Sequence, residues 1–140
     1  MRKKRTPHQF RELKALIWAK TDGLCYYCGT ALLIRAECRD DKPMAMHMDH
    51  LVPLHRDGSE LPDNLVPSCR LCNFMKGAED LEVLRWRRRL LAAKAPVFTP
   101  AQRQWLLSHG VDLDRLLPPH CFWFEENQEG MAIPRQLHAG

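Results

Sequence analysis

No stretch of this sequence is long and apolar enough to cross a membrane, and no internal repeat or low-complexity tract divides it. A membrane-spanning helix needs about 20 consecutive apolar residues, so we expect neither a membrane protein nor a membrane partner. The composition, 45% hydrophobic and 27% charged over 140 residues, is that of an ordinary globular protein. That length fits one domain with a modest core. We expect a core domain over residues 1–95 and an extension over 96–140, packed on the core or appended to it.

Nothing near the start of the chain resembles an export signal, because Met1-Arg2-Lys3-Lys4-Arg5 is followed by charged, helix-like sequence without an apolar core. We therefore expect an intracellular, cytoplasmic protein in a reducing compartment. The six cysteines could pair as three disulfides, but such a framework fits a reducing compartment poorly. Cys38 and Cys121 have no partner at metal-ligand spacing, so we expect them to be free thiols.

The other four cysteines form two Cys-x-x-Cys pairs, Cys25/Cys28 and Cys69/Cys72. Each pair can place two thiolates on one ion, and two pairs complete the tetrahedral sulfur set that zinc prefers in structural sites. The spacing therefore predicts one structural zinc ion per chain. Shared binding of one ion would also close the intervening chain into a loop and bring its polar residues next to a rigid clamp.

Positive charge is concentrated in two clusters, although the net charge is only +4. Among residues 2–20, seven lysines and arginines accompany a single acid, Glu12. The second cluster surrounds Trp86 and consists of Arg85, Arg87, Arg88 and Arg89. Either run could be a solvated helix face, but beside a metal site we interpret both as surfaces for a polyanion such as nucleic acid. The acidic end of the chain would avoid that partner.

Apolar spacing predicts helices on both sides of a central strand and loop. We expect an amphipathic helix over 7–20, a strand over 44–51 and then a loop rich in proline and glycine. A short helical segment over 73–77 and a helix over 79–94 follow. Thr99-Pro100-Ala101-Gln102 predicts another helix start, with an N-cap, a first-turn proline and a capping-box glutamine. We expect the aromatic residues of the extension to cover the core rather than bind a partner: Trp105, Phe122, Trp123 and Phe124.

A polar group in and after the closed loop can perform phosphodiester hydrolysis. That reaction needs a base with a pKa near neutral, a cation to neutralise the phosphate, and a group that orients the base. His50 can act as the base, and an ion held by Asp49 and Asn73 can supply the positive charge. Asn64 can orient the base. Oxygen ligands with open coordination positions suit magnesium or manganese.

The motifs that carry these residues are Cys25-Tyr26-Tyr27-Cys28-Gly29, Asp49-His50-Leu51-Val52-Pro53, Gly58, Asn64-Leu65, and Cys69-Arg70-Leu71-Cys72-Asn73 with Lys76-Gly77. In order and spacing they resemble an HNH endonuclease of the zinc-knuckle type, over about residues 7–80. The resemblance implies an α+β fold: a small ββα-metal core stabilised by the four-cysteine zinc site, with flanking N- and C-terminal helices. It also implies a DNA substrate, double-stranded, products with 5′-phosphate and 3′-hydroxyl ends, and a phage or bacterial setting.

By that resemblance His50 is the general base, Asp49 and Asn73 hold the catalytic magnesium or manganese ion, and Asn64 fixes the His50 ring. Asn73 stands where the family often has histidine, which favours these ions over tightly bound zinc or nickel. His47 stands where many members have an acid. It could contact phosphate or metal, or be an ordinary strand histidine.

Nucleic-acid contacts are expected from Lys76, one helical turn past Asn73, and from Arg85, Arg88 and Arg89. The resulting hypothesis is a metal-dependent DNA endonuclease that nicks or cuts. The alternative is a zinc-stabilised DNA-binding module with a vestigial active site. A protein-interaction module is a third possibility that the arginine clusters weaken.

Overall fold

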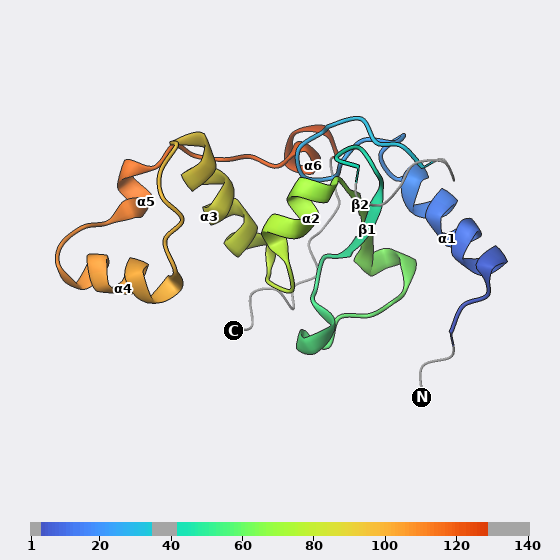
Figure 1. Ribbon diagram of the computed structural model, residues 1–140, viewed down its shortest axis with the longest axis horizontal. Coiled ribbons are helices and arrows are strands. Elements are labelled where there is room, and N and C mark those ends of the chain that lie inside the picture. Colours follow the sequence, from blue (N-terminus) through green and yellow to red (C-terminus); the bar gives the residue numbers. More distant parts are fainter. Residues whose placement is uncertain (1–3, 35–41, 129–140) are drawn as a thin grey trace.

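The computed structural model describes residues 4–34 and 42–128. A two-stranded sheet and a short helix lie near the middle of an elongated molecule, with α1 (Pro7–Ala19) at one end and the extension's helices α4 (Pro100–Ser108) and α5 (Leu113–Leu116) at the other (Figure 1). Cys38 lies outside the described residues, so its expected state as a free thiol is not addressed. Among the described residues, no helix is long and apolar enough to span a membrane.

Helix α1 (Pro7–Ala19) begins and ends close to the predicted positions. Thr6 and Gln9 form a reciprocal capping box, which satisfies backbone N–H groups that a helix start otherwise leaves unpaired. Leu13 and Ile17 are the buried positions of α1. Their spacing of four residues places both on one face, and this face packs against the second strand of the sheet.

The sheet consists of β1 (His47–His50) and β2 (Leu65–Ser68), paired antiparallel from His47 opposite Ser68 to His50 opposite Leu65. Between them, residues 51–64 form a loop with two 3₁₀ turns, η1 (Leu54–Arg56) and η2 (Pro62–Asn64). Helix α2 (Arg70–Lys76) follows β2 directly and packs on β1. Two antiparallel strands followed by a helix, beside a four-cysteine cluster, agree with the predicted α+β fold with a ββα-metal core.

Four further helices follow α2: α3 (Leu81–Ala92), α4 (Pro100–Ser108), α5 (Leu113–Leu116) and α6 (Trp123–Asn127). Asp80 caps α3, and Thr99 with Gln102 forms the predicted capping box of α4. The start of α4 could be predicted because the capping residues are local in sequence.

The extension contributes to the main core through its last described segment. Phe122 and Phe124 are 0% and 3% exposed and join the core cluster that contains Tyr26 and Tyr27. The N–H groups of Trp123 and Phe124 donate to the carbonyls of Tyr27 and Tyr26, at 2.8 and 3.2 Å. The expectation that the extension's aromatic residues cover the core is wrong for Trp105, which is 60% exposed and stacks on His109 instead.

Candidate metal centre and active site

The four paired cysteines converge on one point. Their sulfur atoms all lie within 4.8 Å of one another, and the Cys28 and Cys69 sulfurs are 3.8 Å apart. A tetrahedral zinc ion with Zn–S bonds of about 2.3 Å separates its sulfur ligands by about 3.8 Å. None of the described cysteines forms a disulfide. The residues present therefore fit one structural metal ion such as zinc, as the spacing predicts.

Hydrogen-bond donors surround the sulfur atoms of this centre. The Cys69 N–H points to the Cys25 sulfur at 3.3 Å, and the Cys72 N–H points to the Cys69 sulfur at 3.4 Å. Hydrogen bonding among the thiols, with Cys25 as the main partner, lowers the pKa of Cys69 to about 6. The same network raises the pKa of Cys25 and of Cys72, so binding of one ion by all four sulfurs must release protons from the centre.

Tyr27 connects the first cysteine pair to the candidate active site. Its ring is buried, and its hydroxyl donates to Oδ2 of Asp49 at 2.5 Å. Burial raises the pKa of Tyr27, and the nearby charge of Asp49 raises it further. Tyr27 therefore stays protonated and keeps donating, which fixes one oxygen of the Asp49 carboxylate.

Lys76 lies against the same carboxylate. Its ammonium is 3.2 Å from Asp49 Oδ2 and donates to the His50 carbonyl at 2.7 Å. Burial raises the pKa of Asp49, while the positive charge of Lys76 opposes that rise. The Lys76 side chain is only 1% exposed. The Lys76 ammonium is thus engaged by Asp49 and the His50 carbonyl, and the expected phosphate contact from Lys76 stays a prediction.

Asn64 holds the loop between the strands. Its Oδ1 accepts from the Val52 N–H at 2.9 Å, and its Nδ2 donates to the carbonyls of Val52 and Ser59 at 3.0 and 2.8 Å. Both N–H bonds of the amide are thus used by loop carbonyls. Asn64 therefore fixes the loop that follows His50, and its expected action on the His50 ring stays a prediction.

His50 lies on the walls of two cavities. A cavity of about 340 Å³ is lined by Asp49, His50, His55 and Lys76, among others. A second, of about 300 Å³, lies between α1 and β1 and includes Lys14, His47 and His50 in its lining. The imidazole is therefore positioned where a substrate could reach it.

The oxygen donors near His50 fit a hard divalent ion in their chemistry. Asp49 supplies a carboxylate, and the Asn73 side chain, half-buried on α2, has no hydrogen bond to another described residue. Within the described residues, however, the cysteine centre is the only group of three or more histidine, cysteine or acidic ligands. An ion at Asp49 would share its carboxylate with the Lys76 ammonium, so we expect weak binding.

Residues 25–79 match the HNH endonuclease family model. The match confirms the resemblance stated from the sequence, and it spans both cysteine pairs, β1, β2 and α2. No curated protein and no solved structure matches the chain. The HNH segment implies a family of nucleases that act on nucleic acid.

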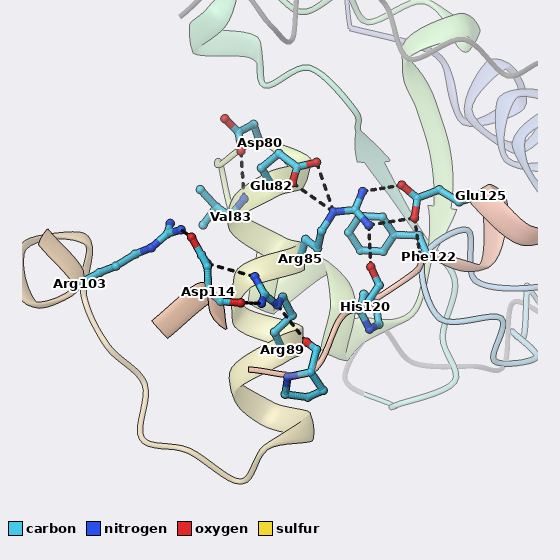
Figure 2. Close-up of polar contacts among 11 residues, drawn as sticks. Asp80, Glu82, Val83, Arg85, Arg89, Arg103, Asp114, His120, Phe122 and Glu125 are labelled. Atoms are coloured by element: carbon cyan, nitrogen blue, oxygen red, sulfur yellow. Dashed lines mark hydrogen bonds and ion pairs between the residues drawn. The ribbon is translucent and has the colours of Figure 1, made fainter. Parts of the chain in front are cut away.

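The arginines of α3 lie outside the HNH segment, and Figure 2 shows two of them, Arg85 and Arg89, engaged with residues of the same protein. Arg85 forms a two-pronged ion pair with Glu125 and donates to the His120 carbonyl at 2.7 Å. Arg89 binds the Asp114 carboxylate at 3.0 Å and carbonyls of the extension. The expectation that these side chains form a nucleic-acid surface is corrected, because their hydrogen-bonding groups already hold the extension.

Arg88 is turned towards the metal centre instead. Its Nη2 donates to the Cys72 sulfur at 2.7 Å, so it too is engaged within the protein rather than offered to nucleic acid. A positive charge beside the thiolates offsets the negative charge that four cysteines bring to one ion. Sequence reasoning missed this contact and that of Tyr27 with Asp49. Only the four-residue offset between Leu84, which is buried, and Arg88 hinted that Arg88 faces inward.

Proposed function

We propose that the chain is a metal-dependent endonuclease that hydrolyses phosphodiester bonds in DNA, with His50 as the general base. The observation that carries this proposal is the position of His50, the last residue of β1, on the walls of two cavities. The residue before it, Asp49, is a buried carboxylate that both Tyr27 and Lys76 contact. A binding module has no chemical need for a base beside a fixed carboxylate.

In this proposal each residue has one task. The neutral imidazole of His50 takes the proton of the attacking water, as general bases near neutral pKa do. A divalent ion bound by Asp49 and Asn73 would neutralise charge on the phosphate and on the leaving oxygen. Tyr27 and Lys76 hold the Asp49 carboxylate in place, and Asn64 holds the loop after His50. The metal clamp of four cysteines stabilises the fold beneath them.

A second candidate is a zinc-stabilised DNA-binding module with a vestigial active site. One observation favours it: the Lys76 ammonium already neutralises Asp49, as it would in a protein that needs no ion there. The two candidates differ in whether any divalent ion supports cleavage.

The test is the nicking rate of supercoiled plasmid across a titration of magnesium and of manganese. We expect His50→Ala to lower the rate about 10²-fold or more, the usual effect of losing a general base. Asn73→Ala and Asp49→Ala should raise the ion concentration that half-maximal activity requires, because they remove ligands. His109→Ala, a change at an exposed histidine of the extension, is the matched control and should nick at the normal rate.

Circular dichroism and zinc content establish that each variant is folded. Cleavage by folded His50→Ala at the normal rate would show that the base is another residue. If the unaltered chain binds DNA but never cleaves it with either ion, the binding-module proposal replaces the nuclease.

A further inference from the structure

We infer that the nucleic acid is held by the outer face of α1, through Arg11 and Lys14, and reaches His50 by the cavity between α1 and β1. This inference rests on the proposed function and goes beyond it by naming the surface that the substrate covers. The occupant is the phosphodiester backbone of DNA.

Charge on α1 and the residues before it is one-sided. Among residues 4–20 the basic side chains are Lys4, Arg5, Arg11, Lys14 and Lys20, and the only acid is Glu12. Glu12 itself lies 3.4 Å from His8, on the exposed side of the helix. Arg11 and Lys14 are three residues apart, so they are neighbours on one helix face. Arg11 is exposed and Lys14 is half-buried, and two such adjacent cations can neutralise neighbouring phosphates.

The cavity connects this face to the candidate base. Its lining includes Arg5 and Lys14 on the α1 side and His47 and His50 on the β1 side. Arg5 is fixed at the rim, because its Nη2 donates to the Glu60 carbonyl at 2.8 Å. A guanidinium has five N–H donors, so this contact leaves others for a phosphate. His47, whose role the sequence left open, thus lies on the path between α1 and His50.

Glu60 also lines this cavity and brings a negative charge to one side of it. A carboxylate repels phosphate, so the phosphates should follow the α1 side of the cavity rather than the loop side.

Within residues 42–128, the other end of the molecule offers no comparable surface. The guanidinium groups of Arg85 and Arg89 are bound by carboxylates and carbonyls of the extension, and Arg88 is bound to a thiolate. Another cavity, of about 580 Å³, lies near α3 and α4. Its lining includes arginines and four acids, which are Asp80, Glu82, Asp112 and Asp114. A polyanion that approaches the protein is therefore attracted to α1 and not to α3.

The experiment measures the affinity of a short labelled duplex DNA by fluorescence anisotropy, over a range of salt concentrations and without added divalent ion. The zinc-loaded full chain is compared with the double variant Arg11→Gln/Lys14→Gln. Each phosphate contact contributes about 0.9 to the slope of log affinity against log salt, so loss of two contacts should lower the slope by about 1.8. The double variant Arg11→Lys/Lys14→Arg should keep the original slope.

The matched control is Lys94→Gln/Arg115→Gln, which removes the same charge from exposed positions beyond α3. Its slope should equal that of the unaltered chain. An unchanged slope for the α1 variant, or an equal fall for the control, would overturn the inference. Plasmid nicking by the unaltered chain tests the proposed function separately. If that chain nicks but the α1 variant keeps the original slope, the nuclease proposal is retained and this inference is wrong. If the α1 variant has a lower slope but the unaltered chain never nicks, the binding surface is retained and the nuclease proposal is wrong.

Discussion

The two basic clusters of this chain look alike in sequence and differ in what surrounds them. On α1, Arg11 is exposed and Lys14 half-buried at a cavity rim. On α3, Arg85 and Arg89 are 21% and 17% exposed, and each binds a carboxylate of the extension. The difference comes from partners that lie far along the chain, 40 residues after Arg85 and 25 after Arg89. A run of arginines therefore predicts anion binding but not whether the anion belongs to the same molecule.

The α3 cluster connects three parts of the structure. Arg85 and Arg89 hold the extension, Arg88 contacts the cysteine centre, and Arg87 donates to the carbonyls of Met75 and Lys76 at the end of α2. Hydrogen bonds from charged groups are stronger than neutral ones, and forked guanidinium pairs also fix geometry. The helix therefore positions the extension relative to the HNH segment.

The largest expected effect tests whether the metal centre stabilises α3 as well as the segment that carries the cysteines. Cys72→Ser removes a metal ligand and the sulfur that Arg88 contacts. Structural zinc sites contribute apparent energies of about 10 kcal/mol or more to folding, so this variant should lose zinc and protection of α2 and α3 together. Native mass spectrometry and hydrogen exchange measure the two losses, with Cys121→Ser as the control at an exposed cysteine. Retained zinc, or intramolecular disulfides in the unaltered chain, would refute the clamp.

A smaller effect separates the arginine that faces the metal from its neighbour. Arg88→Met removes the donor to Cys72, and Arg89→Met removes the contacts to Asp114 but none to sulfur. Groups that hydrogen-bond to metal ligands typically change metal affinity by about 10- to 100-fold. We expect that loss of zinc affinity from Arg88→Met alone, measured by competition with a chromogenic chelator. Equal zinc affinities for the two variants would mean that the Arg88 contact does not tune the centre.

Much of the fold could be predicted because its signals are local. The α1 and α4 starts follow from capping residues within one turn, and the metal centre follows from two short cysteine spacings. The contacts of Tyr26 with Phe124 and of Tyr27 with Phe122 could not be predicted. Nothing near the two tyrosines in sequence indicates which aromatic residues cover them. In the sequence, residues 121–124 are only a short apolar run, and its pattern allows a strand or a docking segment.

In the candidate site, too, local sequence signals could be predicted and contacts between distant residues could not. The type and order of Asp49, His50 and Asn73 predict the chemistry, and all three lie within the segment that matches the HNH model. Their neighbours depend on packing. Lys76 follows Asn73 by one turn, but only the fold shows that this turn directs it inward to Asp49. The roles of the three active-site residues in cleavage stay a prediction that kinetics must test.

The smallest effect tests the ion pair that joins α3 to α6. A hydrogen bond from Arg85, foremost among several causes, lowers the pKa of Glu125 from its usual 4.5. A carboxylate with a lowered pKa stabilises the fold at pH values above 4.5, and this contribution is lost as the pH falls through the folded-state pKa. Since the pair is partly exposed, Glu125→Gln should cost about 1 kcal/mol or less at neutral pH. The cost should disappear in acid.

Urea unfolding at several pH values measures this difference, because urea does not screen charges as guanidinium does. The comparison between variant and unaltered chain cancels any acid-driven loss of zinc, which affects both. Glu126→Gln changes the next residue of α6 and should show no pH-dependent difference, since Glu126 does not bind Arg85. If Glu125→Gln is as stable as the unaltered chain at every pH, the pair contributes nothing, and Arg85 would then hold the extension through the His120 carbonyl and the Phe122 ring alone.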